Sequence, residues 1–600
     1  MNYLSRYAFP AVLAILAGTT GAAQTATAPG ALNEVLSTSA AGGYSTGKGP
    51  ADYSGIGASY SAQRNSFDSG VIGDNAWYSM LQYDFNTPTP IFAYTFGSGM
   101  AENKIKAPRA WELLASDDGE NWVTLDMRSN VAQLEEGDYV MMYKPGKSDR
   151  GTDFGKVADE LLDMIDQRFY ADWGNGKYLM HAWSADPDKI NRGYNYWWMA
   201  HAVDAYIDAY SRVEDTDRGR KIIYRNHAED IRKGMYTAYD ANRQDLWNNY
   251  NDDMEWMCMA CIRAYKALPS GNEEWLADAR QLFDWIWESW DETTGGLLWK
   301  TDSERGVLSS KNSCGNAPAM ICANLLYEIT GDEAYLEKSR MIFDFMLENN
   351  LFDDGFVKDA PGNDNRGWTF TYNQGTWAGG LLGLYKATGD RKYYDTAIDL
   401  MDKSMDSRWY SPHGIMGESG KGDGGLFKGI YIRNITEWVL SGLLNEEHAT
   451  RYTLYLLENA RSLAENAIVR PDMTVMANWL DQSEAGLETY DSSVVLSGLF
   501  LLESIDKLRR AGILDENYAL TGERMNKPYT HYRLKVTDNY GSRTTEFNSF
   551  SLLSDKPSDV ALLTADSDDD IYYTIEGMPR RGTPSTPGLY IKDRKKFLIR

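Results

Sequence analysis

The heptapeptide TGDEAYL at residues 330–336 has two relatives in the same chain, SGNEEWL at 270–276 and TGDRKYY at 388–394. The glycines of the three copies follow one another after 60 and then 58 positions. In each copy we expect the glycine to end one helix and the Asn or Asp after it to cap the next helix, with the aromatic residue packing inward. The repeat therefore predicts helical hairpins, which stack into either an open solenoid or a closed ring.

The helical pattern extends far beyond these three copies. Apolar residues recur at spacings of three and four from Phe154 to about Arg510, in about twelve segments joined by loops with Gly, Pro and Asn. Twelve helices arranged as six hairpins are what an (α/α)6 barrel requires. We therefore predict a multidomain chain with an all-α (α/α)6 barrel over residues 150–512, and the open solenoid stays as the alternative.

The segments before and after the helical region have sequence patterns typical of β-strands. Residues 53–147 contain short alternating runs such as IFAYTF at 91–96, separated by turn signals, and HYRLKV at 531–536 alternates again after the helices. Period-two alternation over such short runs indicates half-buried strands. We expect a β-sandwich here.

The beginning of the chain has the features of an export signal. Residues 1–23 combine Arg6 with an apolar core at 8–17 and a small-residue cleavage site, and residues 24–52 form a leader rich in Ala, Ser, Thr and Gly that we expect to be flexible. The apolar core is shorter than the roughly 20 residues that a membrane-spanning helix needs. We predict a protein that is secreted or otherwise extracytoplasmic, in the periplasm or at the cell surface, with no transmembrane segment.

Composition narrows the choice of partner. The chain of 600 residues carries a net charge of −26, which argues against nucleic acid and anionic membranes because both attract basic surfaces. It also has 19 Trp and 39 Tyr, a surplus that serves either a large core or the flat apolar faces of sugars. A neutral glycan bound by a monomeric protein is compatible with both numbers.

Cysteine and histidine usage argues against a disulfide scaffold and against a metal enzyme. The chain has four cysteines, and Cys258 and Cys261 form a C-x-x-C without a second such pair. We interpret all four as small buried hydrophobes, with a disulfide between two helices as the alternative. The six histidines show no metal-ligand spacing, so we expect no metal site and no cofactor requirement, with a structural Ca²⁺ conceivable in the β-sandwich.

Asp252 and Asp253 are the candidates for chemistry. They lie in WNNYNDDMEW at residues 247–256, where a strongly apolar helix begins. Two acids at a helix start are ordinary capping residues in many proteins, but here aromatic residues crowd them on both sides. Glycoside hydrolysis needs two carboxyl groups, about 5–5.5 Å apart in retaining enzymes, a separation that adjacent side chains can reach. The helix dipole would keep one acid ionised, and its charge would raise the pKa of the other.

Several motifs resemble glycoside hydrolase family 76, the endo-α-1,6-mannanases. Besides NDDMEW at 251–256 they are, in chain order, WD at 290–291, GGLLW at 295–299, KNSCGN at 311–316, FVKD at 356–359, YNQG at 372–375 and DGGLFKGI at 423–430. The resemblance covers about residues 155–510. It implies an (α/α)6 barrel and retaining cleavage of α-1,6-mannan, with Asp252 as the nucleophile and Asp253 as the acid/base.

Further residues near these motifs are candidates for substrate binding. Trp299, Trp368, Tyr372 and Trp377 serve as sugar platforms or as core, and Asp354 and Asp359 bind mannose hydroxyls or are solvated loop charges. Gln374 has an amide that both donates and accepts, and Lys428 is a candidate partner for an active-site acid. The full predicted set is Tyr250, Asn251, Trp256, Trp299, Asn316, Asp354, Asp359, Trp368, Tyr372, Gln374, Trp377 and Lys428.

The β segments carry a resemblance of their own. The run at residues 106–122 resembles the central strands of a discoidin-type (coagulation-factor type-C) sandwich, and those at 532–539 and 545–552 resemble its last strands. We therefore expect one discoidin-like β-sandwich made of residues 53–147 and 527–556, with the barrel inserted between them. Residues 560–600 resemble a small chitobiase-type C-terminal β module, which we expect to be incomplete.

Three functions follow as hypotheses. The first is a retaining endo-α-1,6-mannanase acting on mannan or another mannose-containing polysaccharide. The second is a transglycosidase that remodels such glycans with the same acids. The third is a non-catalytic glycan-binding protein, which the intact Asp252-Asp253 pair disfavours.

Overall fold

A computed structural model shows two compact units, which we describe separately. Residues 151–512 form a helical unit, and residues 1–150 together with 513–600 form a β-rich unit. The structure describes residues 105–133, 152–172, 177–236, 238, 242–269, 271–362, 369–417, 420–484 and 486–541, and strand segments at 59–61, 66–68, 79–91, 93–97, 139–143, 546–553, 571–574, 579–581, 588–592 and 595–599. The predicted signal peptide at 1–23 and leader at 24–52 lie outside these residues.

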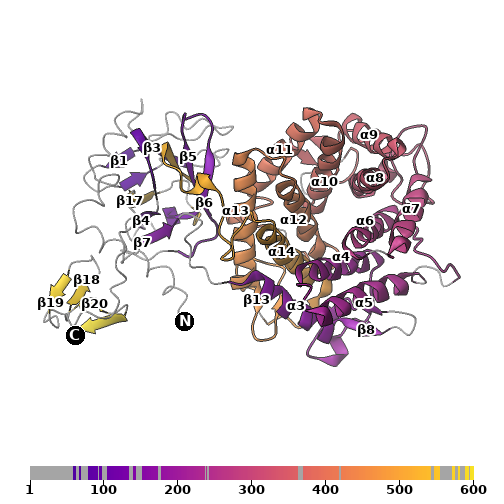
Figure 1. The fold of residues 1–600 in the computed structure, drawn as a ribbon, viewed down its shortest axis with the longest axis horizontal. Coiled ribbons are helices and arrows are strands. Elements are labelled where there is room, and N and C mark those ends of the chain that lie inside the picture. Colours follow the sequence, from indigo (N-terminus) through magenta and orange to yellow (C-terminus); the bar gives the residue numbers. More distant parts are fainter. Residues whose placement is uncertain are drawn as a thin grey trace. The chain divides into compact units, whose positions relative to one another are not determined.

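The described part of the helical unit contains twelve long helices in six hairpins (Figure 1). Each even-numbered helix belongs to an inner ring, and each odd-numbered helix covers it from outside. The inner helices are α4 (Tyr196–Arg212), α6 (Asn251–Ala267), α8 (Ala317–Thr330), α10 (Thr371–Thr388), α12 (Gly424–Leu440) and α14 (Ser492–Arg510). The outer helices are α3 (Phe154–Arg168), α5 (Arg218–Met235), α7 (Glu273–Trp287), α9 (Glu333–Glu348), α11 (Arg391–Asp406) and α13 (Glu446–Ser462).

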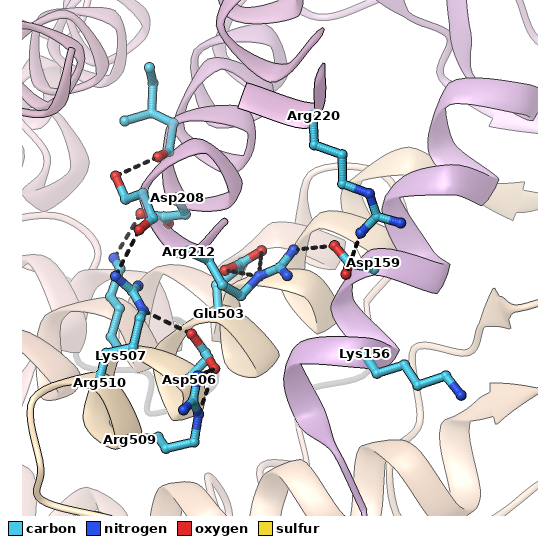
Figure 2. Close-up of polar contacts among 12 residues, drawn as sticks. Lys156, Asp159, Asp208, Arg212, Arg220, Glu503, Asp506, Lys507, Arg509 and Arg510 are labelled. Carbon is cyan, nitrogen blue, oxygen red and sulfur yellow. Dashed lines mark hydrogen bonds and ion pairs between the residues drawn. The ribbon is translucent and has the colours of Figure 1, made fainter. Parts of the chain in front are cut away.

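The inner ring is closed. Each inner helix packs against the next one along the chain, and the last, α14, packs against the first, α4. Two ion pairs join α4 to α14: Arg212 Nε lies 3.0 Å from Glu503 Oε2, and Lys507 Nζ lies 2.7 Å from Asp208 Oδ1 (Figure 2). The helical unit is thus an α/α barrel as predicted, and the open solenoid is wrong.

The three repeats end and begin helices as expected, with one difference. Gly331 and Gly389 adopt left-handed conformations after α8 and α10, and Asp332 and Asp390 cap α9 and α11 through their side chains. In the first copy the side chain of Asn272 donates instead to carbonyls at the end of α6, including that of Tyr265 at 2.8 Å. The Asn272 amide has N–H donors that an ionised aspartate lacks, so it can donate to the carbonyls at the end of the preceding helix.

Glycines allow the inner helices to approach closely. A Cβ atom on Gly375 of α10 would stand 2.5 Å from the Cα atom of Tyr431 on α12, and one on Gly429 of α12 would stand 2.8 Å from the Cα atom of Ser497 on α14. Backbone meets backbone at these points, so a side chain cannot be accommodated by a rotamer change. These two glycines therefore permit the close approach of α10 to α12 and of α12 to α14.

Short strand pairs decorate the loops of the barrel. They are β8 (Tyr170–Asp172) with β9 (Lys177–Leu179), β10 (Ala182–Trp183) with β15 (Tyr490–Asp491), β11 (Phe352–Asp353) with β12 (Phe356–Val357), and β13 (Ile468–Val469) with β14 (Thr474–Val475).

All four cysteines of the chain are buried free thiols, so the disulfide interpretation is wrong. Among the described helices none is long and apolar enough to cross a membrane.

The β-rich unit is built from both ends of the chain. Strand β16 (Tyr529–Asn539) lies between β3 (Ser79–Thr89) and β5 (Pro108–Ser116), and β6 (Val123–Arg128) completes this sheet. Strand β17 (Glu546–Leu553) lies between β2 (Ser66–Asp68) and β4 (Ala93–Gly97), with β1 (Ser59–Ser61) and β7 (Tyr139–Tyr143) at the edges. The expected pairing of residues 530–553 with strands from the N-terminal segment is therefore present.

A buried polar chain links the two sheets of this unit. Trp111 Nε1 in β5 donates to the Tyr94 hydroxyl in β4 at 2.8 Å, and that hydroxyl donates to Asp126 Oδ2 in β6 at 2.7 Å. Arg128 pairs with the same carboxylate at 2.8 Å. A separate antiparallel sheet near the C-terminus has the order β19 (Pro579–Arg581), β18 (Ile571–Thr574), β20 (Gly588–Lys592) and β21 (Lys595–Ile599).

We expect Gly375→Ala to lower the free energy of unfolding by about 1–3 kcal/mol, because the new methyl group overlaps the backbone of α12. Thermal or denaturant unfolding of the full chain measures the change. The matched control is Gly219→Ala in α5, where the nearest atom to the new Cβ is 3.7 Å away and a helical alanine is favoured. Equal stability of Gly375→Ala and the wild type would contradict the close packing of α10 on α12.

Candidate active site

Asp252 and Asp253 lie in the first turn of inner helix α6, where Tyr250 is the N-cap residue. The carboxylate of Asp252 accepts three hydrogen bonds. Its Oδ1 accepts from the backbone N–H of Asp253 at 3.1 Å, and its Oδ2 accepts from Trp299 Nε1 at 3.0 Å and from the Cys314 thiol at 3.4 Å. These bonds come from the α6 backbone and from two loop segments before α8, so Asp252 is held in one orientation.

The carboxylate of Asp253 accepts one side-chain hydrogen bond, fewer than that of Asp252. Its Oδ2 accepts from Asn248 Nδ2 at 3.0 Å, and Asn248 is itself fixed because its Oδ1 accepts from the backbone N–H of Tyr250 at 2.9 Å. Both asparagine contacts lie within the turn that leads into α6. The turn therefore orients the second acid locally.

The two acids differ in what sets their proton affinity. Burial raises the pKa of Asp252 to about 6, although the hydrogen bonds from Trp299 and Cys314 lower it. Burial also raises the pKa of Asp253 well above its ordinary value, and the negative charges of Asp252 and Asp423 raise it further. The sequence led us to expect one raised pKa, but desolvation acts on both acids. When the pair carries one proton, these charges favour its location on Asp253.

Asp423 is a third acid; it opens the motif at 423–430 but is not among the site residues predicted from the sequence. It precedes α12, and its Oδ1 accepts from Asn195 Nδ2, Trp197 Nε1 and Trp198 Nε1 at 3.2, 3.1 and 3.0 Å. These bonds come from the start of α4, so two inner helices meet at this carboxylate. The aromatic triplet Tyr196–Trp198 at a helix start was the available signal for this cluster.

Glu255 brings a further buried carboxyl group close to the pair. It lies one turn after Asp252 on α6 and is fully buried. Burial and the charge of Asp252 raise the pKa of Glu255 well above its ordinary value. A neutral side chain here avoids adding another negative charge beneath the two acids.

Aromatic side chains form the exposed wall beside Asp252. The Trp299 side chain is 39% exposed, and its ring meets that of Tyr250 edge-on with centroids 5.2 Å apart. The Lys300 ammonium lies 4.5 Å from the centroid of the Tyr250 ring. Tyr372, in contrast, is buried and stacks on Phe427 at 4.1 Å. Burial raises the pKa of Tyr372, and the negative charges of Asp359 and Asp252 raise it further.

Asp359 lies in the same electrostatic neighbourhood as Tyr372. Its Oδ1 accepts from Asn373 Nδ2 at 3.1 Å. Burial raises the pKa of Asp359, and its hydrogen bonds with Asn373 and Tyr372 oppose that rise. This half-buried carboxyl is therefore unlike the solvated loop charge that was its alternative interpretation.

Two predicted asparagines shape the loop that carries Trp299. Asn251 Nδ2 donates to the carbonyl of Leu298 at 2.7 Å, and its backbone N–H donates to the carbonyl of Trp299 at 2.9 Å. Asn316 Oδ1 accepts from the backbone N–H of Leu297 at 2.9 Å. Both are fully buried and support the loop, so their predicted contact with substrate is corrected to a positioning role.

Four other predictions need similar correction. Gln374 exchanges two 2.8 Å hydrogen bonds with the backbone of Val357, and Trp377 is completely buried with its ring stacked on Phe343. Trp256 is also a core residue. Asp354 is an exposed turn residue 3.8 Å from the Lys403 ammonium on outer helix α11.

Lys428 is buried, and its Nζ donates to the Ala477 carbonyl at 2.5 Å and lies 3.8 Å from the centroid of the Trp479 ring. These contacts give Lys428 a structural function, and its predicted pairing with an active-site acid stays a prediction. Trp368 lies outside the described residues. Within the described chain no three His, Cys, Asp or Glu side chains are grouped so that they could hold a metal ion.

Curated relatives match part of the chain. The mannan endo-1,6-alpha-mannosidase DFG5 of Saccharomyces cerevisiae is 26% identical over 260 residues, which cover 40% of this chain and 56% of that protein. The mannan endo-1,6-alpha-mannosidase DCW1 of Candida albicans is 25% identical over 223 residues, 35% of this chain and 49% of that protein. The chain spans about half the length of the curated relatives it matches.

Two solved structures match this chain over nearly their whole length. The GH76A α-1,6-mannanase of Salegentibacter sp. HEL1_6 is 31% identical, with a TM-score of 0.52, and the match covers 59% of this chain and 98% of that chain. An inactive variant of that enzyme, in which two consecutive aspartates are replaced by alanine, is known in complex with α-1,6-mannotetrose and matches with the same identity and TM-score over 60% of this chain and 100% of that chain. The family model for glycosyl hydrolase family 76 matches residues 161–503. Because this match covers more than half of the chain, the protein belongs to glycosyl hydrolase family 76.

Proposed function

We propose that the protein is a retaining, endo-acting glycoside hydrolase that cleaves α-1,6-mannosidic bonds in mannan. The observation that carries this proposal is the pair Asp252 and Asp253 at the start of α6. Their hydrogen-bond partners differ, and the charges of Asp252 and Asp423 add to burial in raising the pKa of Asp253. The α-1,6-mannanase activity of the Salegentibacter relative, and the loss of activity when two consecutive aspartates of that enzyme are replaced, support the same function here.

Asp252 is the proposed nucleophile. Its carboxylate is fixed by the Trp299 indole and the Cys314 thiol, and both bonds favour the ionised form. In the first step Asp252 forms a bond to the anomeric carbon while the glycosidic bond breaks. Fixation in one orientation lowers the entropic cost of this attack.

Asp253 is the proposed acid/base. The charges of Asp252 and Asp423 keep a proton on Asp253, which it donates to the departing glycosidic oxygen. Once Asp252 is covalently bound and no longer charged, the pKa of Asp253 falls. Asp253 then removes a proton from the water molecule that releases the sugar from Asp252.

Substrate binding is assigned to the exposed aromatic wall. The half-exposed rings of Trp299 and Tyr250 offer apolar faces against which mannose units can stack. The same Trp299 indole bonds to Asp252, so a sugar stacked there lies next to the nucleophile.

We also propose a domain organisation, a location and an oligomeric state for the protein. The β-rich unit is proposed to be a discoidin-type sandwich that the barrel interrupts, and the pairing of β16 and β17 with strands from the N-terminal segment supports this arrangement. The export features of residues 1–23 support an extracytoplasmic location. The protein is proposed to act as a monomer.

Asp252→Asn and Asp253→Asn should each lower kcat on linear α-1,6-mannan by on the order of 10²-fold or more, because one removes the covalent step and the other removes leaving-group protonation. Separation of the released oligosaccharides measures turnover. The control is Asp395→Asn on outer helix α11, an exposed acid paired with Arg391, which should retain wild-type activity.

The same product separation distinguishes the alternatives. Release of shorter oligosaccharides supports hydrolysis, and elongated products indicate transglycosylation. No product with the wild type indicates a binding protein. Near-normal turnover of either Asn variant would show that the catalytic assignment is wrong.

The pH profile of kcat/KM should be bell-shaped. It should rise with pH through about 6, where Asp252 becomes ionised, and fall at higher pH, where Asp253 loses its proton. In Cys314→Ala the acidic limb should shift to higher pH, because a hydrogen bond that favours the ionised form is lost. Cys314→Ser retains a donor and is the control. An identical acidic limb in all three proteins would contradict the role of the thiol.

We propose that no metal or other cofactor is required for catalysis, because two carboxyl groups suffice for the chemistry. Activity should therefore persist in excess chelator. Tm should be followed in parallel, so that loss of a structural Ca²⁺ from the β-rich unit is recognised. A chelator that abolished turnover without lowering Tm would indicate a metal-dependent mechanism.

A further inference from the structure

The inner helices line a cavity of about 460 Å³. All six inner helices contribute lining residues, among them Asp208 on α4, Arg263 on α6, Asn324 on α8, Gly383 on α10, Arg433 on α12 and Lys507 on α14. Arg263 lies about 16 Å along α6 from Asp252. Neither Asp252 nor Asp253 lines this cavity.

Three cations share two buried carboxylates in its wall. Asp204 accepts from Arg263 Nη1 at 2.7 Å and from Arg433 Nη1 at 2.5 Å. Asp208 pairs with Lys507 at 2.7 Å and also accepts from Arg263 (Figure 2 shows the pair of Asp208 and Lys507). Both aspartate side chains are only 4% exposed, whereas the three cations are 14–21% exposed. The cationic groups therefore reach further toward solvent than their carboxylate partners.

This arrangement leaves the cavity rich in hydrogen-bond donors. Each arginine has five N–H donors and the lysine has three, and neither type accepts. Counting the remaining lining residues, five cations (Arg263, Lys266, Lys386, Arg433 and Lys507) face four anions (Asp204, Asp208, Glu328 and Glu437). The surplus is positive in a chain with a net charge of −26. Such a site favours a ligand with acceptor oxygens and a negative charge.

Two buried polar side chains in the same wall have unused hydrogen-bonding atoms. Asn324 is 6% exposed, and its Oδ1 has no hydrogen-bond partner. His201 is 3% exposed, and neither ring nitrogen has a hydrogen-bond partner, since Asp204 Oδ2 lies 3.7 Å from Nδ1. Buried polar groups are normally satisfied. These atoms are therefore available to a bound molecule that carries hydroxyl groups.

The orientation of Asn324 follows from a glycine on the neighbouring helix. A Cβ atom on Gly383 would stand 2.4 Å from Asn324 Nδ2, so only glycine lets this side chain lie against α10. There Nδ2 donates to the Gly380 carbonyl at 2.9 Å. The amide is thereby fixed with Oδ1 as its unpaired acceptor.

We infer that this cavity binds a small hydroxylated organic anion, whose carboxylate or phosphate oxygens accept from Arg263, Arg433 and Lys507 and whose hydroxyls bond to Asn324 and His201. Its volume lies within the range of about 300–1,000 Å³ that is usual for small-molecule sites. Sugar acids and sugar phosphates share this chemistry. The site is separate from the acid pair and does not depend on the proposed hydrolysis.

Calorimetric titration of the full chain with mannuronate, mannose 6-phosphate and mannose tests the inference and separates the two sources of charge. We expect at least one of the two anions to bind at a single site, roughly tenfold or more tightly than neutral mannose, the size of one charge-assisted hydrogen bond. Asn324→Leu and Lys507→Gln should each weaken the anion by a similar factor. Lys403→Gln, which removes a surface cation of outer helix α11, should leave binding unchanged.

Two further results decide where the anion binds. Asp253→Asn should bind it as tightly as the wild type, whether or not mannan is hydrolysed, and a crystal soaked with the tighter anion should show it between Arg433 and Asn324. The inference is overturned if neither anion binds at millimolar concentration, if mannose binds equally well, or if the soaked anion lies only beside Asp252 and Asp253. Should Lys507→Gln fail to fold, Asn324→Leu and the soaked crystal still give the answer.

Discussion

Closure of the helical ring between α4 and α14 holds together two helices that are almost 300 residues apart in the chain. Arg212 of α4 meets the fully buried carboxylate of Glu503 on α14, and a second contact, at 2.9 Å, ties Arg212 to Asp159 of α3 (Figure 2). Burial raises the pKa of Glu503 to about 7, while the Arg212 charge opposes that rise. Removing one partner of such a buried pair typically costs about 3–5 kcal/mol, because the other charge is left uncompensated. These contacts between α4, α14 and α3 therefore stabilise the closed ring.

Closure gives the two ends of the barrel different chemistry. The inner helices begin at one end, where Asp252, Asp253 and Asp423 gather near helix N-termini that favour negative charge. Further along, the same helices line the cavity that includes Arg263, Arg433 and other cations. At the first end, burial and the charges of Asp252 and Asp423 raise the pKa of Asp253.

The repeats and the acid pair were readable from sequence because their signals are local. A glycine followed by an Asp cap is complete within a few residues, and Asp252 and Asp253 are adjacent. The Cys314 thiol and the Asp423 carboxylate reach the acid pair from the loop before α8 and the start of α12, which only the ring brings near α6. The predictions that Gln374 and Trp377 bind substrate were wrong because their local sequence pattern does not show what the side chain faces. A polar or aromatic residue beside glycines has the same local pattern whether it faces a ligand or a neighbouring backbone.

The β-rich unit contains strands from before and after the barrel in the sequence, so the barrel is inserted into it. Strand β16 enters its sheet between two strands that precede the barrel in sequence, and it exchanges backbone hydrogen bonds with both. The register along β5 continues from His531 to Val536 before it shifts, so pairing fixes where the chain must return after α14. An inserted domain is tolerated only if its own ends lie close enough for this return. A closed ring meets that condition through its geometry, because its first and last hairpins are neighbours, whereas an open solenoid of the same six hairpins would carry its ends apart.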